Sequence, residues 1–250
     1  MEIYARDFEV MEKDDQSPLT EADMRAHEII VKGLQALTPD IPVLSEESAE
    51  IPWDERRQWE RYWLVDPLDG TKEFIKKNGE FTVNIALIHG HTAAMGVVYA
   101  PVLDRTYSAA EGEGAFLAED GESRAIHVRP HEQGAAWRVV GSRSHAGGKL
   151  ADFLHQLGEH ELISMGSSLK LCLVAEGKAD VYPRLGPTSE WDTAAAQCVV
   201  EQAGGRVVDT DMNTLRYNAK EDVLNPYFMV DANQGTDWRQ FLADDASSTG

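Results

Sequence analysis

Two aspartates and a threonine lie close together in a segment that follows a short apolar run. Trp63-Leu64-Val65 is typical of the end of a buried strand, and Asp66-Pro67-Leu68-Asp69-Gly70-Thr71 is typical of the turn that leaves it. Two carboxylates held together away from water repel each other unless a proton or a cation lies between them. The segment therefore predicts a site for a hard divalent cation, which prefers oxygen ligands. Taken alone, it is equally compatible with an ordinary polar surface turn.

Further acidic groups occur at the boundaries of other predicted elements, where functional residues tend to lie. Asp23 lies near the start of a predicted helix, Glu46-Glu47 follows a short predicted strand, and Asp192 precedes an Ala-rich helix. Asp192 by itself is more typical of a helix N-cap. If that helix start faces a cleft, its free N–H groups and its dipole also favour a bound phosphate.

The elements that must position these residues fall into two halves. Residues 1–135 contain a predicted helix that ends near Leu37 and then short β-rich segments between glycines, which indicates an antiparallel meander. From Trp137 onward strands alternate with helices, which indicates crossover connections and a largely parallel sheet. We therefore expect a layered α+β or α/β fold with lobes over residues 1–135 and 136–235, and a partly disordered tail over residues 236–250.

Composition limits the partners and the compartment. The formal net charge of −20 disfavours binding to a nucleic-acid polymer, although a small phosphate ester is compatible if cations and local Arg or Lys reverse the potential at one cleft. The apolar runs are shorter than the roughly 20 residues of a membrane-spanning helix. Charged residues near Met1 disfavour a signal peptide. Cys172 and Cys198 lie in apolar helical contexts, which predicts buried free thiols in a reducing compartment.

Taken together, the acidic segments resemble the signatures of the inositol monophosphatase superfamily of lithium-sensitive, magnesium-dependent phosphatases. The segments are Glu46-Glu47, Asp66-Pro67-Leu68-Asp69-Gly70-Thr71 and Trp191-Asp192-Thr193-Ala194-Ala195. Finer matches are similar to the bacterial 3'(2'),5'-bisphosphate nucleotidases of that superfamily. They are Asp15 to Asp23, Asp66 to Ile88, Ser142-Arg143-Ser144-His145 and Gly166-Ser167-Ser168-Leu169-Lys170. The resemblance extends to about residue 230. It has one departure, because members of the superfamily usually begin with a further helix before the segment that starts here at Met1.

The resemblance implies a fold and an activity. The fold is an antiparallel six-stranded lobe followed by a smaller lobe with a mainly parallel sheet. The activity is Mg²⁺-dependent hydrolysis of the 3'-phosphate of 3'-phosphoadenosine 5'-phosphate (PAP) to AMP and phosphate in sulfur assimilation, with its sulfated form PAPS as a second substrate. The expected location is the cytoplasm, or the cytoplasmic side of the inner membrane as a peripheral protein. The oligomeric state stays open.

The resemblance also implies a role for each matching residue. Glu46, Asp66 and the carbonyl of Leu68 would hold one Mg²⁺, while Asp66, Asp69 and Asp192 would hold a second. A third, weaker Mg²⁺ would lie near Asp23. Asp23 and Thr71 would orient and deprotonate the attacking water, and Glu46 completes the catalytic set. The substrate-binding set would comprise Gly70, Thr71, His145, Ser167, Lys170, Arg184 and Asp192.

Several alternatives remain open at this stage. The same fold could act on inositol monophosphate or on a sugar bisphosphate. A haloacid-dehalogenase-type phosphatase also carries an Asp-x-Asp-Gly-Thr-like element, but the spacing of Asp66 and Asp69 does not match it. A non-enzymatic metal-binding or phosphate-binding module is the remaining possibility. Lys170 and His145 also fit a solvated helix side chain and a plain loop histidine, respectively.

Overall fold

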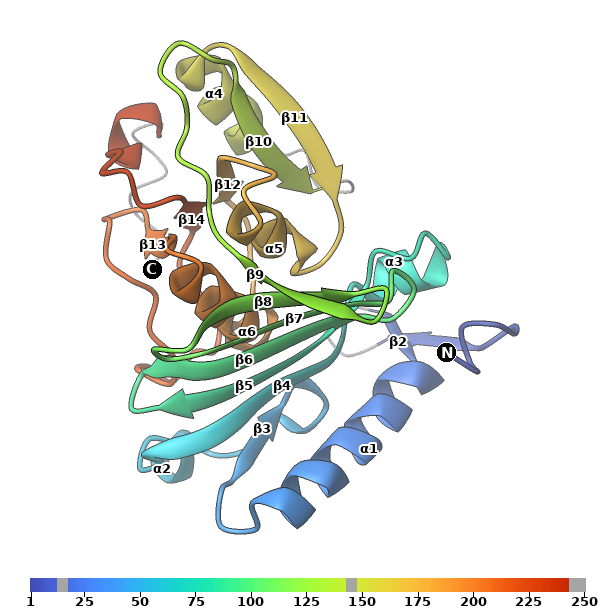
Figure 1. Cartoon of the computed structure of the whole chain (residues 1–250). Helices are drawn as coiled ribbons and strands as arrows, with labels where there is room; N and C mark the ends of the chain where they lie inside the picture. Colours follow the sequence, from blue (N-terminus) through green and yellow to red (C-terminus); the bar gives the residue numbers. More distant parts are fainter. Residues whose placement is uncertain (13–17, 143–147, 243–250) are drawn as a thin grey trace.

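Two main β-sheets, of seven and five strands, contain most of the strands, and helices pack on their faces (Figure 1). A separate two-stranded sheet lies near the N-terminus. The computed structural model describes residues 1–12, 18–142 and 148–242. His145 and residues 243–250 of the predicted tail lie outside the described residues. Within the described residues, the layered α/β architecture predicted from the sequence is confirmed.

The larger sheet has seven strands in the order β3-β4-β5-β6-β7-β8-β9. Their bounds are β3 Val43–Ser45, β4 Arg61–Asp69, β5 Thr82–His89, β6 Thr92–Ala100, β7 Arg105–Ala110, β8 Gly114–Glu119 and β9 Glu122–Ile126. Strands β4 to β9 form the predicted antiparallel set of six. Short turns join β5 to β9, whereas the connection from β4 to β5 contains the helix α3 (Thr71–Ile75).

The larger sheet has one strand more than the six that were predicted, and the additional strand is β3. It pairs in parallel with β4, with Leu44 opposite Leu64. A parallel neighbour needs a longer crossover than a tight turn provides. Here η1 (Glu46–Ser48), α2 (Trp53–Arg56) and their flanking residues supply that crossover. The short apolar run before Glu46 is therefore part of the main sheet.

The smaller sheet has five strands in the order β11-β10-β12-β14-β13. Their bounds are β10 Trp137–Ser142, β11 His160–Met165, β12 Val181–Arg184, β13 Arg206–Asp209 and β14 Phe228–Asp231. β10 pairs in parallel with β11 and β12, whereas β14 is antiparallel to both of its neighbours. The prediction of a mainly parallel sheet is therefore wrong for half of the pairings. The chain returns from β13 to β14 without a helix, so no parallel crossover forms.

Two helices cover opposite faces of the larger sheet (Figure 1). α1 (Glu21–Leu37) lies against β3 and β4, and its capping box is formed by Thr20 and Asp23. α6 (Glu190–Gln202) comes from the second half of the chain and packs on β5, β6 and β7. A Cβ on Gly96 of β6 would lie 2.2 Å from the carbonyl oxygen of Ala195, so only glycine permits this approach. The core is therefore shared between the two halves.

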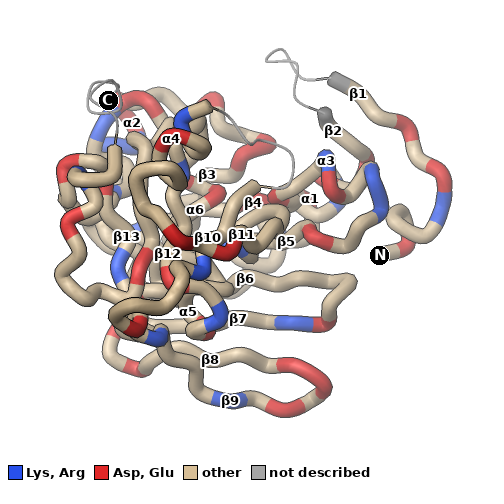
Figure 2. Tube along the Cα trace, turned by 90° about the horizontal axis from the view of Figure 1, so that it is seen from above, with Lys and Arg blue, Asp and Glu red and all other residues tan. Residues whose placement is uncertain are grey.

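The remaining elements connect and cap the sheets. They are β1 Val10–Glu12, β2 Pro18–Thr20, α3 Thr71–Ile75, α4 Gly148–Leu157, α5 Leu169–Ala175 and η2 Trp238–Phe241. Cys172 and Cys198 are buried free thiols, as predicted. Within the described ranges, no helix combines the length and the apolarity that crossing a membrane requires. Acidic residues are spread along the whole trace (Figure 2), so a cationic cleft must be built locally.

Candidate active site

A β-bulge near the end of β4 brings two aspartates to one place. Asp66 pairs with Asn84 of β5 and Asp69 pairs with Thr82, so β4 advances three residues while β5 advances two. In a regular strand, residues three apart point to opposite faces of the sheet. The extra residue in the bulge removes that alternation, and both carboxylates reach the same side.

The carboxylates of Asp66, Asp69 and Asp192 form a compact group at this edge of the sheet. Each residue offers one oxygen, and these oxygens lie within 4.8 Å of one another. Asp192 arrives from the first turn of α6, and Glu46 from η1 lies close enough to repel both Asp66 and Asp192. We call Glu46, Asp66, Asp69 and Asp192 the acidic centre.

Burial and mutual repulsion disfavour the charged forms of this group. Burial is the main cause that raises the pKa of Asp66 well above its ordinary value, and Glu46, Asp69 and Asp192 add to the shift. The pKa of Asp192 is raised to about 8 by burial and then by Asp69 and Glu46. A divalent cation bound among these oxygens would remove the repulsion. The donor set, which consists of carboxylates, suits a hard cation.

Hydrogen bonds from the protein fix the orientation of each aspartate. Asp66 Oδ1 accepts from the backbone N–H of Leu68 at 2.9 Å. Asp192 Oδ2 accepts from the backbone N–H of Ser189 at 2.9 Å. Asp69 Oδ2 accepts from the backbone N–H of Ser168 at 2.5 Å. It also accepts from the Thr82 hydroxyl and the Asn84 side-chain amide of β5, each at 3.4 Å. The acidic centre is therefore held by three separate elements.

Asp23 and Thr71 form a hydrogen-bonded pair beside the acidic centre. Asp23 is 1% exposed, and its Oδ2 accepts from the backbone N–H of Thr20 at 2.8 Å and from the Thr20 hydroxyl at 2.6 Å. The Thr71 hydroxyl donates to Asp23 Oδ1 at 3.2 Å. Gly70, which precedes α3, has a φ of 93°, where a side chain would be strained. The helix cap thus serves to aim one carboxylate at Thr71.

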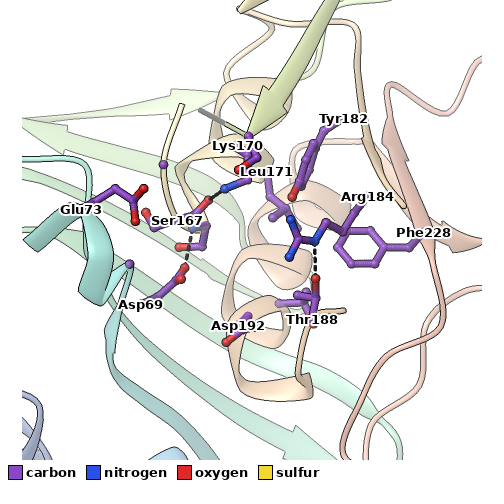
Figure 3. A pocket seen from close by; sticks show the side chains of 15 residues that line it. Asp69, Glu73, Ser167, Lys170, Leu171, Tyr182, Arg184, Thr188, Asp192 and Phe228 are labelled. Atoms are coloured by element: carbon purple, nitrogen blue, oxygen red, sulfur yellow. Dashed lines mark hydrogen bonds between the residues drawn. The ribbon is translucent and has the colours of Figure 1, made fainter. Parts of the chain in front are cut away.

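A pocket with an empty volume of about 580 Å³ opens beside Asp69 and Asp192. Figure 3 shows these two aspartates on its lower side in the view, Lys170 on its upper side and Arg184 on its right. Lys170 is buried, and its ammonium donates to the carbonyl oxygen of Ser167 at 2.6 Å. Burial lowers the pKa of Lys170 to about 8, although Asp69 opposes the shift.

Ser167, Lys170 and Arg184 form what we call the basic wall of this pocket. The Arg184 guanidinium donates to the carbonyl oxygen of Pro187 and to the hydroxyl of Thr188, which fixes its direction. Ser167 has a φ of 47°, which is uncommon for a residue with a side chain. Its buried hydroxyl has no hydrogen-bond partner among the described residues. Buried polar atoms are normally paired, so this oxygen is suited to a ligand.

The model of the inositol monophosphatase family matches residues 1–243. The chain belongs to the inositol monophosphatase family. Members of this family depend on metal ions, and the acidic centre provides the carboxylate cluster that such chemistry requires. The membership also removes the haloacid-dehalogenase alternative based on Asp66 and Asp69.

Similar proteins include nucleotidases named CysQ and an inositol monophosphatase. The 3'(2'),5'-bisphosphate nucleotidase CysQ of Salmonella typhimurium is 55% identical over 92% of this chain and 92% of that protein. The crystal structure of CysQ from Bacteroides thetaiotaomicron is 47% identical, with a TM-score of 0.78 over 89% of this chain and 87% of that chain. The inositol monophosphatase from Anabaena is 26% identical, with a TM-score of 0.73 over 88% and 84% of the two chains.

Sequence reasoning missed several side chains that line the pocket of this family member. Glu73 of α3 faces it, and Tyr182 and Phe228 meet edge to face with ring centroids 6.0 Å apart. The two aromatic residues lie in short strands and carry no signal that separates them from core residues. Glu73 had a signal, because it lies within the segment Gly70 to Phe74 that resembles the family.

Proposed function

We propose that this chain is a Mg²⁺-dependent 3'(2'),5'-bisphosphate nucleotidase that hydrolyses PAP to AMP and phosphate. The observation that carries the proposal is the joining of two anion sites of different chemistry in one pocket. The acidic centre needs cations to bind a phosphate, whereas Lys170 and Arg184 can bind one directly. A substrate with two separate phosphates fits both. The relatives that carry the nucleotidase name support this choice.

The acidic centre would hold the metal. In this proposal, Glu46, Asp66 and the carbonyl of Leu68 bind one Mg²⁺, and Asp66, Asp69 and Asp192 bind a second, with a third near Asp23. Support comes from the raised pKa of Asp66 and of Asp192, because such carboxylates gain most from a bound cation. Bound Mg²⁺ would neutralise charge on the transferred phosphoryl group and lower the pKa of a bound water.

The Asp23–Thr71 pair would activate the attacking water. The Thr71 hydroxyl already donates to Asp23, so its oxygen is free to accept a proton from water as its own proton moves to Asp23 Oδ1. Glu46 is the third proposed catalytic residue, at the edge of the acidic centre. The backbone N–H groups of Gly70 and Thr71 would donate to the scissile phosphate.

The basic wall would hold the 5'-phosphate. Arg184 presents a fork that can bind a phosphate through two N–H groups, and Lys170 adds a compact charge. The unpartnered hydroxyl of Ser167 would donate one further hydrogen bond to this phosphate. Asp192 lines the same pocket as Lys170 and Arg184, so in this proposal it would lie close to the bound substrate. His145 is proposed as a further contact to the substrate. We also propose that the protein is located in the cytoplasm.

The direct test is the release of inorganic phosphate from PAP with and without Mg²⁺. We expect turnover only with the metal, and slower turnover of inositol 1-phosphate under the same conditions. PAPS in a third reaction would show how far the 5'-group matters. Clear preference for inositol 1-phosphate would reject the nucleotidase in favour of an inositol phosphatase. No phosphate release from any of these substrates would leave a binding module.

Inhibition by other cations is a further expectation. Li⁺ and Ca²⁺ would displace Mg²⁺ from the acidic centre while providing the wrong charge or coordination geometry. Millimolar Li⁺ should therefore lower the rate of PAP hydrolysis, and added Mg²⁺ should restore part of it. The same concentration of Na⁺ is the control. A rate unaffected by Li⁺ would contradict the proposed metal arrangement.

A further inference from the structure

Arg56 of α2 makes a reciprocal clamp with a residue far away in the sequence. It is only 4% exposed, and its Nη1 donates to Asn218 Oδ1 at 2.7 Å. In return, Asn218 Nδ2 donates to the carbonyl oxygen of Arg56 at 2.6 Å. The guanidinium also donates to the carbonyl oxygens of Lys220 and Glu221, and it lies over the ring of Trp53. The hydrogen bonds join α2, which lies in the connection between β3 and β4, to residues 217–225, which we call the brace segment.

The brace segment is bonded in turn to the first turn of α6. The backbone N–H of Asn218 donates to both carboxylate oxygens of Glu190, at 3.1 and 2.9 Å. The backbone N–H of Glu190 donates to the carbonyl oxygen of Val223 at 2.8 Å. Asn225 Nδ2 donates to the carbonyl oxygen of Ser189 at 2.9 Å and to the hydroxyl of Thr193 at 3.0 Å. The start of the helix is thus fixed through both its backbone and its side chains.

This same turn carries Asp192 of the acidic centre. One oxygen of Asp192 lies within 4.8 Å of oxygens of Asp66 and Asp69, so the charged carboxylates repel one another when no cation lies between them, and this repulsion favours movement of the turn away from β4. Ser189 donates its backbone N–H to Asp192, and Asn225 holds the carbonyl of Ser189. The brace therefore opposes the displacement that the repulsion would cause.

We propose that Arg56 and Asn218 are positioning residues that hold Asp192 at metal-binding distance from Asp66 and Asp69. Neither residue lines the pocket, so neither touches the substrate. The inference rests on the proposed function, because it requires a metal ion at Asp192. It adds a second group of residues on which metal affinity depends. Their contribution comes through the position of the helix.

The most specific test removes only the side-chain amide of Asn218. Asn218 has a φ of 50°, a conformation that glycine adopts without strain, so Asn218→Gly keeps the backbone and its N–H bond to Glu190. Calorimetric titration with Mg²⁺, without substrate, should show about tenfold weaker binding, as for other residues that orient metal ligands. The matched control is Asn233→Gly, at an exposed asparagine with a φ of 54°. Its Mg²⁺ affinity should equal that of the wild type.

A second variant tests the other half of the clamp. Arg56→Lys keeps the charge but loses the fork, whereas Arg57→Lys changes an exposed neighbour that pairs with Asp54. Only Arg56→Lys should raise the Mg²⁺ concentration needed for half-maximal PAP hydrolysis, with kcat at saturating Mg²⁺ near that of the wild type.

The outcomes separate the two proposals. A lower unfolding temperature with unchanged Mg²⁺ affinity in both clamp variants would overturn the positioning role of Arg56 and Asn218, because a purely structural contact has that effect. A wild-type protein that binds no Mg²⁺ and releases no phosphate from PAP would instead overturn the proposed function.

Discussion

The acidic centre and the basic wall face the same pocket but differ in what they need to be complete. Lys170 and Arg184 already donate to carbonyl and hydroxyl oxygens of the protein. Asp66, Asp69 and Asp192 accept some hydrogen bonds, yet their remaining oxygens converge on one another. Folding alone therefore builds the basic wall, whereas the charged carboxylates of the acidic centre still repel one another until a proton or a cation lies between them.

Burial shifts pKa values in opposite directions in the two regions, and the shifted values are similar. It raises the pKa of Asp192 to about 8 and lowers the pKa of Lys170 to about 8. Each group is thus driven toward its neutral form in the empty pocket. Counter-charges from the ligands, cations on one side and phosphate on the other, would restore both charges. Substitutions in one region at a time can test whether the acidic centre and the basic wall differ in this way.

The largest effect is expected in the acidic centre. Asp66→Asn removes a proposed ligand shared by two ions, so kcat/KM for PAP should fall by about 10³-fold, since bound metals contribute several kcal/mol to the transition state. The metal-free variant should also be more stable than the metal-free wild type by about 1–3 kcal/mol, because one repelling carboxylate is gone. Phosphate release and urea unfolding measure these effects. Asp54→Asn, at an exposed aspartate, should change neither.

A smaller and different effect is expected in the basic wall. Lys170→Met should raise KM for PAP by about 10- to 100-fold, the value of one or two hydrogen bonds to a charged group. The change should nearly vanish for 3'-AMP, which lacks the 5'-phosphate. Steady-state kinetics with both substrates checks this, with Lys178→Met at an exposed lysine as the control. Equal losses on both substrates would show that Lys170 does not bind the 5'-phosphate.

The two regions should also respond differently to pH. The folded pKa of Asp192 lies near 8, above its ordinary 3.8, so the folded state binds protons more tightly and stability falls as pH rises from 3.8 to 8. The pKa of Lys170 is lowered from 10.5 to about 8, so its contribution makes stability rise between pH 8 and 10.5.

Without metal, the free energy of unfolding should therefore be lower at pH 8 than at pH 6, by about 2 kcal/mol from Asp192. Saturating Mg²⁺ should remove most of this dependence because it competes with the proton. Urea titrations at the two pH values, with and without Mg²⁺, provide the measurement. A dependence that Mg²⁺ leaves unchanged would place the responsible groups outside the acidic centre.

The smallest effect is expected at Ser167. Its hydroxyl has no partner in the described residues, so Ser167→Ala should not lower the unfolding temperature. KM for PAP should rise by about 10-fold through the loss of one hydrogen bond to the charged phosphate. Ser123→Ala, on the exposed strand β9, is the control. A lower unfolding temperature without a change in KM would assign Ser167 a structural role.

The acidic residues could be predicted from the sequence because each lies near a boundary of an element. Asp66 lies near the end of a buried strand that continues to Asp69, and Asp192 is in the first turn of a helix, so both were expected close to the ends where sites form. The bulge that turns Asp66 and Asp69 to one side was not predictable, because its cause is the pairing of β4 with β5. Pairing depends on the neighbouring strand as well as on the segment itself.

Other features of the site depend on contacts that no local pattern encodes. The clamp joins Arg56 and Asn218 across 162 positions of the sequence, and neither belongs to a motif. The left-handed backbone of Ser167 goes against the preference of its residue type. The alternation of strands and helices after Trp137 predicted a largely parallel sheet, but β14 pairs antiparallel with both of its neighbours. Tertiary packing decides all three.

The close packing of α6 on Gly96 of β6 has a consequence for how activity can be lost by mutation. α6 rests on Gly96 so closely that even one methyl group there would meet the carbonyl of Ala195. A substitution at Gly96 would displace α6, and with it Asp192, without removing any polar atom of the pocket. A genetic screen for inactive variants should therefore recover residue 96, in the middle of an apolar sheet, together with the carboxylates.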